Sequence, residues 1–130
     1  MKLIKAPNSW LEKTVAPFDF KTNDAIKIEE EMSAIMTENK GVGLAANQVE
    51  LDAQIFMLTP VDLKGYKDDV PFAIINPKIT HVTQDMIIGE EGCLSFPWLV
   101  LKIKRPKAIA VTYQDQDGQT MLASFSDLSS

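Results

Sequence analysis

The chain has 130 residues, of which 45% are hydrophobic and 24% charged, a balance that is ordinary for one soluble globular domain. Its net charge of −5 excludes a general attraction to nucleic acid, and no apolar run approaches the ~20 residues of a membrane helix. The start lacks the apolar stretch of a secretory signal, and one cysteine excludes an internal disulfide framework. These features together predict a cytosolic protein.

The first predicted element is an amphipathic helix of about four turns. Thr22 or Asn23 offers an N-cap, and Gly41 is expected to stop the helix at its C-terminal end. The apolar positions that recur at helical spacing are Ala25, Ile28, Met32, Ile35 and Met36.

Short strands with turn signals between them are predicted for the rest of the chain. Asn76-Pro77 and Asp117-Gly118 are two of these turn signals. The predicted strands are Gln54–Thr59, Phe72–Ile75, Lys78–Val82, Met86–Ile88, Lys107–Gln114 and Gln119–Phe125. One helix followed by such strands predicts an α+β fold with mostly antiparallel pairing.

The Gly41–Gln48 segment, GVGLAANQ, is the first candidate for a functional motif. Two glycines one residue apart let a backbone approach a ligand closely. A dinucleotide-binding loop would follow a strand and open a helix, whereas this segment follows a helix, so a glycine turn is the main alternative. Gln48 lies among apolar residues, and its amide needs a partner if it is buried.

Cys93 lies in the second candidate motif, EEGCLSFP. A lone cysteine is most often a small buried residue, but a nucleophile or a metal ligand is also open from residue type. His81 is the only histidine, and its place in an alternating strand favours a structural role. One thiolate and one imidazole fall short of the three protein ligands of a catalytic zinc-type site.

Two further segments have an ordinary interpretation as parts of the fold. The basic residues Lys102, Lys104, Arg105 and Lys107 are expected to form a solvated strand edge and not a nucleic-acid patch. The apolar run Trp98–Leu101 either lines a cleft or covers the core, and core cover is the expectation.

The two candidate motifs together resemble those of the peptide deformylases, metallohydrolases that remove the formyl group from the N-terminal methionine of nascent proteins. That family is recognised by G-φ-G-φ-A-A-x-Q, E-G-C-φ-S and H-E-x-x-H, in which φ is apolar. The first is complete in Gly41–Gln48 and the second in Glu91–Ser95, in the family order. The third is absent from the 130 residues.

The resemblance implies a single catalytic domain over residues 1–130, with small antiparallel sheets packed around helices. It also implies that the helix bearing H-E-x-x-H would follow Ser130, so the domain is expected to be incomplete at its C-terminal end. Without that helix, an exposed apolar patch is expected from Ile55, Met57, Ile74, Ile109, Val111 and Leu122.

The resemblance assigns Cys93 as a ligand of one divalent metal, whose bound water would attack the formyl carbon. Fe²⁺ is the expected ion, and Zn²⁺, Ni²⁺ or Co²⁺ could substitute. The side-chain amide of Gln48 and the backbone N–H of Leu94 would stabilise the oxyanion. Glu91 and Arg105 would form an ion pair that supports the cysteine loop.

The implied substrate is an N-formylmethionyl peptide, bound along the strand that begins near Gly41. The implied substrate-binding residues are Val42, Gly43, Leu44 and Gly92. A monomer is expected, with transient ribosome contact as a family option and without nucleic acid or membrane partners. The alternatives are a peptide-binding protein without hydrolytic activity and a folded fragment with an incomplete metal site.

Overall fold

The computed structural model describes residues 1–59 and 71–126, which form one α-helix, two short 3-10 helices (η1 and η2) and seven strands. The helices are η1 (Ser9–Glu12), α1 (Ala25–Glu38) and η2 (Ala46–Val49). The strands are β1 (Gly43–Ala45), β2 (Ile55–Leu58), β3 (Phe72–Val82), β4 (Met86–Cys93), β5 (Phe96–Pro106), β6 (Ala108–Gln114) and β7 (Thr120–Ser126).

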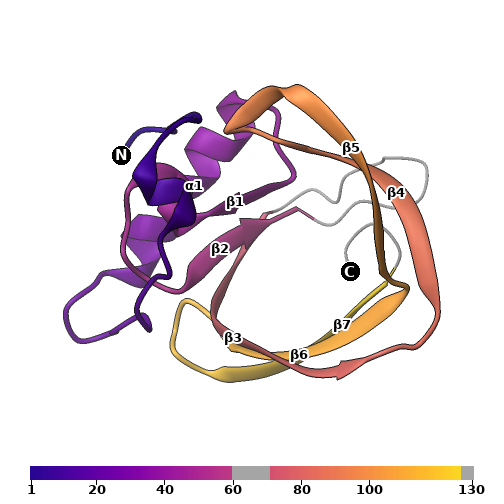
Figure 1. Ribbon diagram of the computed structural model, residues 1–130. Helices are drawn as coiled ribbons and strands as arrows, with labels where there is room; N and C mark the ends of the chain where they lie inside the picture. Colours follow the sequence, from indigo (N-terminus) through magenta and orange to yellow (C-terminus); the bar gives the residue numbers. More distant parts are fainter. Residues whose placement is uncertain (60–70, 127–130) are drawn as a thin grey trace.

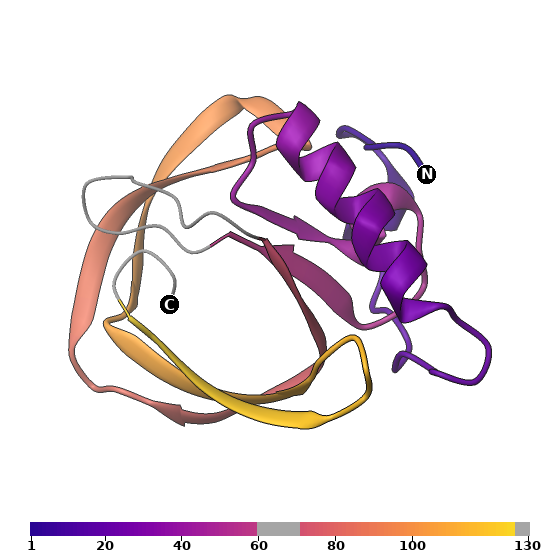
Figure 2. The ribbon, with the colours of Figure 1, turned by 180° about the vertical axis from the view of Figure 1, so that it is seen from behind.

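The strands form two antiparallel sheets, as the sequence predicts. Five of them form a sheet in the order β1-β2-β3-β6-β7, and β4 and β5 form a separate two-stranded ribbon. This ribbon lies between β3 and β6 in the chain and arcs away from the five-stranded sheet (Figures 1 and 2). Its tip returns to the end of α1 that leads into β1, so segments distant in sequence meet there.

The N-terminal cap of α1 differs from the predicted one. Asp24 is the N-cap, and its side chain accepts a hydrogen bond from the backbone N–H of Lys27 at 3.2 Å. The predicted caps Thr22 and Asn23 instead donate their backbone N–H groups to the carbonyl of Asp19, at 3.3 and 3.1 Å. These two residues therefore belong to a turn that precedes the helix.

The C-terminal end of α1 also corrects the prediction for Gly41. Lys40, with φ 57°, takes the left-handed conformation that usually favours glycine. The N–H of Lys40 bonds to the carbonyl of Thr37 at 3.1 Å, and that of Gly41 to the carbonyl of Met36 at 2.9 Å. This is a Schellman ending in which Gly41 is the second residue after the cap.

Asn76-Pro77 is a bulge within β3, and the prediction of a turn between two strands is wrong. The register of β3 against β6 shifts between Ile75 and Lys78, while Asn76 has φ 49°. The side chain of Asn76 accepts from the N–H of Phe18 at 2.7 Å and donates to its carbonyl at 3.2 Å. The bulge therefore fastens the segment before α1 to the centre of the sheet.

Two clusters of buried side chains lie on the sheet. The larger cluster joins α1 to the strands through Met32, Met36, Ile55, Met57 and Ile75, among others. The smaller contains Ile74, Val111 and Phe125. Four residues of the predicted exposed patch are thus buried, namely Ile55, Met57, Ile74 and Val111. Leu122 is 74% exposed, as predicted, because it alternates along β7 with Ala123 and Phe125, which face the smaller cluster.

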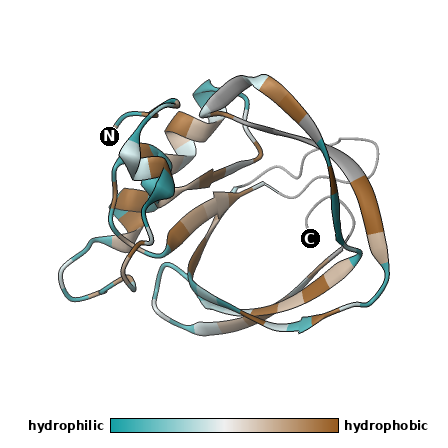
Figure 3. Ribbon diagram, viewed as in Figure 1, coloured by the Kyte–Doolittle hydropathy of each residue, from teal (hydrophilic) through white to brown (hydrophobic). Residues whose placement is uncertain are grey.

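Strand β5 was not among the predicted strands, and its apolar residues do not cover the core as expected. Trp98 is 68% exposed and Val100 63%. A two-stranded ribbon has one neighbour per strand, so each of its faces needs a separate layer to bury it. Figure 3 shows hydrophobic residues on this ribbon as well as on α1 and the main sheet.

Lys102, Lys104 and Arg105 are exposed on β5, in agreement with a solvated strand. Within the described ranges, no helix is long and apolar enough to span a membrane.

Candidate functional site

The Gly41–Gln48 segment forms an edge strand followed by a short helix. β1 pairs with β2 in the register Gly43 to Leu58, and it is one of the two outer strands of the five-stranded sheet. Val42 is 41% exposed and Gly43 is also exposed, so both can meet a ligand. The side chain of Leu44 is buried in the core, which leaves its backbone as the part available for binding.

The second motif lies at the tip of the β4–β5 ribbon. β4 ends at Cys93, Leu94 and Ser95 form the turn, and Phe96 begins β5 opposite Cys93. Leu94 is half-buried and packs against the larger core cluster. A Cβ placed on Gly41 would lie 2.6 Å from Leu94 Cδ1 and 3.2 Å from its Cγ, so the two motifs are in van der Waals contact.

A hydrogen-bond network joins the same two motifs. Gln48 Nε2 donates to the hydroxyl of Ser95 at 3.2 Å, and Gln48 Oε1 accepts from the backbone N–H of Ala45 at 3.0 Å. Ser95 is fully buried, and its hydroxyl donates to the carbonyl of Ile4 at 2.6 Å. The partner that the amide of Gln48 was expected to need is therefore a serine of the second motif.

The metal-ligand prediction rests on Cys93, whose side chain lies outside the described residues, as does that of Glu91. His81 lies exposed on β3, opposite Ala110. Among the described side chains, which do not include those of residues 89–93, no group of three or more His, Cys, Asp or Glu is placed to hold a metal. The described residues therefore do not form a metal site by themselves.

The predicted pair of Glu91 and Arg105 is placed by the ribbon's register alone. Glu91 is opposite Leu101, and Arg105 is opposite Ile87. The position opposite Arg105 is thus four residues from Glu91 along β4. Their ion pair stays a prediction.

Two carboxyl groups outside both motifs have displaced pKa values. Burial raises the pKa of Glu29, and the nearby charges of Asp117, Glu30 and Asp115 raise it further. The pKa of Asp52 is lowered, first by the hydrogen bond that it accepts from the N–H of Ala16 and then by Lys13.

The structure adds two participants that the sequence reasoning missed, Ser95 and the segment around Ile4. In the sequence Ser95 is the last residue of the E-G-C-φ-S motif, and a polar residue beside Leu94 and Phe96 is a signal for a buried hydrogen-bond partner. The N-terminal segment has no periodic pattern, and its contact with Ser95 spans 91 positions. No local signal could have revealed that contact.

Comparisons with known proteins bear on the motifs and on the fold. The family profile for polypeptide deformylase matches residues 1–130. A peptide deformylase of Synechocystis sp. is 39% identical over 110 residues, which are 83% of this chain and 57% of that protein. One of Hydrogenovibrio crunogenus is 35% identical over 121 residues, which are 93% of this chain and 69% of that protein. The chain thus spans little more than half of the Synechocystis relative.

Solved structures agree with these sequence comparisons. Peptide deformylase from Thermotoga maritima superposes with a TM-score of 0.86 at 31% identity, over 97% of this chain and 81% of that one. The enzyme of Vibrio parahaemolyticus bacteriophage VP16T, in complex with actinonin, gives 0.85 at 31% identity, over 98% and 88%. These matches confirm the α+β fold that the resemblance implied. The chain, which carries two of the family's motifs in contact with each other, belongs to the polypeptide deformylase family.

Proposed function

We propose that residues 1–130 provide the peptide-binding and oxyanion-stabilising side of a deformylase active site, acting on N-formylmethionyl peptides. One observation carries the proposal. The ribbon tip with Leu94 is held against the segment that runs from Gly41 to Gln48, by side-chain contact and by the Gln48–Ser95 hydrogen bond. Residues from two distant motifs therefore face one region, as a site for a single substrate requires.

The chemistry of amide hydrolysis explains why these groups are suitable. Attack on the formyl carbon produces a tetrahedral oxyanion, which fixed N–H donors stabilise. Gln48 Oε1 is held by the N–H of Ala45, which directs Nε2 toward the ribbon tip. The amide of Gln48 and the backbone N–H of Leu94 are therefore proposed as the donors. Loss of one such donor costs a factor of about 10²–10³ in rate.

The edge position of β1 supports peptide binding by strand addition. An extended peptide can pair with an outer strand through backbone hydrogen bonds, while side-chain pockets provide specificity. Val42 and Gly43 are exposed there, and Val42 is proposed to contact the methionine side chain. Leu44 and Gly92 are proposed to take part through their backbones.

The metal part of the proposal rests on the family. Cys93 is proposed as a ligand, with Fe²⁺ as the ion and Zn²⁺, Ni²⁺ or Co²⁺ as substitutes. Because the described residues bring no set of three ligating side chains together, we derive no step of the reaction through the metal. Glu91 and Arg105 are proposed to support the loop that holds Cys93. The reaction is proposed to occur in the cytosol, in a monomer that contacts the ribosome transiently.

Three measurements on the purified protein test the proposal: intact mass, metal content by elemental analysis, and formate release from a formyl-Met-Ala-Ser peptide. We expect bound metal and formate release. Cys93→Ala should abolish metal retention, whereas Gln48→Ala should lower kcat by about 10²-fold or more with the metal still bound. Exposed Ser124 on β7 offers a control, since Ser124→Ala should change neither property. Equal metal loss in the Cys93 and Gln48 variants would contradict the assigned roles.

A second candidate function is peptide binding without hydrolysis. The observation that favours it is the exposed edge of β1, where Val42 and Gly43 can meet an extended peptide without a metal. Titration with the formyl peptide separates the two functions. Saturable binding without metal and without formate release would support the second, and formate release would exclude it.

A further inference from the structure

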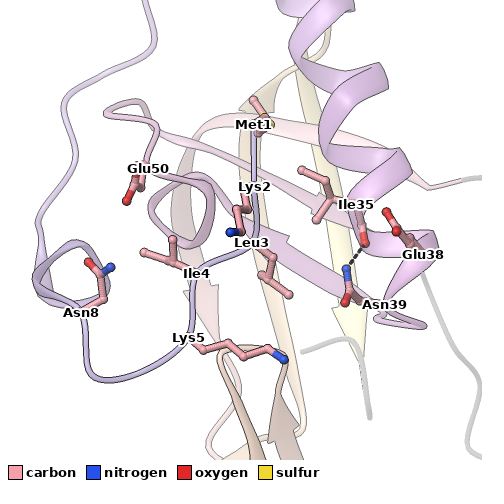
Figure 4. A pocket seen from close by; sticks show the side chains of 10 residues that line it. All are labelled: Met1, Lys2, Leu3, Ile4, Lys5, Asn8, Ile35, Glu38, Asn39 and Glu50. Atoms are coloured by element: carbon pink, nitrogen blue, oxygen red, sulfur yellow. Dashed lines mark hydrogen bonds between the residues drawn. The ribbon is translucent and has the colours of Figure 1, made fainter.

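The N-terminal segment of the chain is bonded to both motifs at once. The N–H of Ile4 donates to the carbonyl of Gln48 at 2.8 Å, and the N–H of Ala6 donates to the carbonyl of Ser95 at 2.9 Å. Leu3 packs against the larger core cluster and anchors the segment. Figure 4 shows this segment passing between Glu50, which follows η2, and the end of α1 at Asn39.

In this arrangement the hydroxyl of Ser95 uses its only proton in one hydrogen bond. A serine hydroxyl has one proton to donate, and here it goes to the carbonyl of Ile4 at 2.6 Å. Toward Gln48 the oxygen can then only accept, so Gln48 must present Nε2 and not Oε1. Because Ser95 is fully buried, water does not offer it an alternative partner.

The contact on the other side of the amide requires the same orientation. The N–H of Ala45 can only donate, so it needs Oε1 of Gln48 as its acceptor, at 3.0 Å. A flipped amide would place two donors together at Ala45 and two acceptors together at Ser95. Ala45 and Ser95, which lie in separate segments of the chain, therefore require the same orientation of the Gln48 amide.

We propose that Ser95 and the segment Ile4–Ala6 are positioning residues of the site, which fix the amide orientation of Gln48 and the backbone that follows Leu94. The assignment rests on the proposed function in one respect, the role of Gln48 as oxyanion donor. The orientation itself is independent of activity. In this arrangement the segment Ile4–Ala6 acts on the two proposed donors through its hydrogen bonds to Gln48 and Ser95.

The test follows the side-chain amide of Gln48 by NMR on ¹⁵N-labelled protein, with the resonance pair assigned by its loss in Gln48→Ala. Ser95→Ala is nearly isosteric, so the fold should persist. We expect hydrogen exchange of this pair to become about tenfold faster or more, with the resonances of α1 unchanged. Ser124→Ala makes the same chemical change at an exposed position and should leave the pair unaffected. Unchanged exchange in Ser95→Ala would overturn the proposal.

A second variant tests the N-terminal segment. Ile4→Pro removes the N–H that donates to the carbonyl of Gln48, and it should also speed exchange of the Gln48 pair. Lys2→Pro, outside the bonded segment, is the control and should have no effect. If Ile4→Pro and Lys2→Pro change hydrogen exchange of the Gln48 amide equally, the segment Ile4–Ala6 has no positioning role.

Kinetics distinguish this proposal from the proposed function. In an active enzyme, Ser95→Ala should lower kcat about fivefold with KM nearly unchanged, and Ser95→Thr, which keeps the hydroxyl, should restore part of the loss. An equal loss in both variants would contradict the positioning role. Absence of formate release from the unmodified protein would count against the proposed function alone, since the NMR result stands without turnover.

Discussion

The side chain of Leu94 occupies the space that a Cβ on Gly41 would need, with 2.6 Å between that Cβ and Leu94 Cδ1. Contacts between carbon atoms are normally at least ~3.5 Å, so the two cannot coexist without movement. Lys40 takes the left-handed conformation at the end of α1, so the need for glycine at position 41 comes from this contact.

Gly41→Ala should displace Leu94 and destabilise the fold by about 1–3 kcal/mol. Combined with Leu94→Ala, the cost should be smaller than the sum of the two single costs, because the truncated side chain leaves room for the new methyl group. Urea unfolding of the four proteins in this cycle measures the coupling. At Gly43 the nearest atom to an added Cβ is 3.7 Å away, so Gly43→Ala is the matched control. Additive costs at positions 41 and 94 would disprove the coupling.

Asn76 should be among the most sensitive polar positions of the sheet. Its side chain bonds to both the N–H and the carbonyl of Phe18 and to Gln114 Oε1 at 2.8 Å, while its φ of 49° disfavours most other residues. Asn76→Ala loses the bonds and keeps the strain, which should cost about 2–4 kcal/mol. Asn76→Gly relieves the strain and should cost less. Equal unfolding midpoints for the two variants would indicate that strain contributes nothing.

Glu29 should make the protein more stable as the pH is lowered toward the range in which this carboxyl titrates. Its folded pKa is raised by burial and by Asp117, Glu30 and Asp115, so the folded state binds more protons than the unfolded state between the two pKa values. The free energy of unfolding therefore falls as pH rises through that window and stays reduced above it. Oε2 of Glu29 is buried and lacks a hydrogen-bond partner among the described residues, which agrees with the direction.

Glu29→Gln should raise Tm at pH 7 by about 1–3 °C and weaken the pH dependence in that window. Thermal unfolding followed by circular dichroism from pH 4 to pH 7 measures both effects. The exposed neighbour Glu30 provides the control, because Glu30→Gln should change Tm less. A lower Tm for Glu29→Gln at pH 7 would reverse the sign and refute the assignment.

The exposed apolar residues of the β4–β5 ribbon should bind a hydrophobic dye, and at high protein concentration they should promote non-specific association of the monomer. Ile88 is 71% exposed and Val100 63%. The double variant Ile88→Thr with Val100→Thr keeps strand propensity and should lower both dye fluorescence and the associated fraction, at a stability cost of about 1 kcal/mol or less. Ile26→Thr, at an exposed position of α1, is the control. Light scattering that is unchanged by the double variant would show that this surface does not drive association.

Much of the fold could be predicted from local pattern, but the residues that contact across the site could not. The helix and the antiparallel strands follow from periodicity and turn residues, and Asp117-Gly118 does form the β6–β7 turn, with φ 80° at Gly118. Asn76-Pro77 was misread because a bulge and a turn use the same residue types. β5 was missed because the run from Trp98 to Leu101 has no alternation.

The site was predictable only as far as its motifs extend. The resemblance brought Gln48 and Leu94 into one hypothesis, and the structure shows their segments in contact. The reason for glycine at position 41 and the role of Ser95 depend on atoms that meet through the tertiary fold. Such contacts leave no periodic trace in the sequence.

The β4–β5 ribbon has a consequence for the rate at which the chain folds. β3 and β6 are neighbours in the sheet although the whole ribbon separates them in the chain. When β4 and β5 have paired, the pair Met86 and Pro106 holds the two ends of the ribbon together. The N–H of Thr83 then lies 3.0 Å from the carbonyl oxygen of Ala108. The entropy cost of joining β3 to β6 is therefore reduced to that of closing a short loop. Substitutions that weaken the ribbon should therefore slow refolding in stopped-flow experiments more than they speed unfolding.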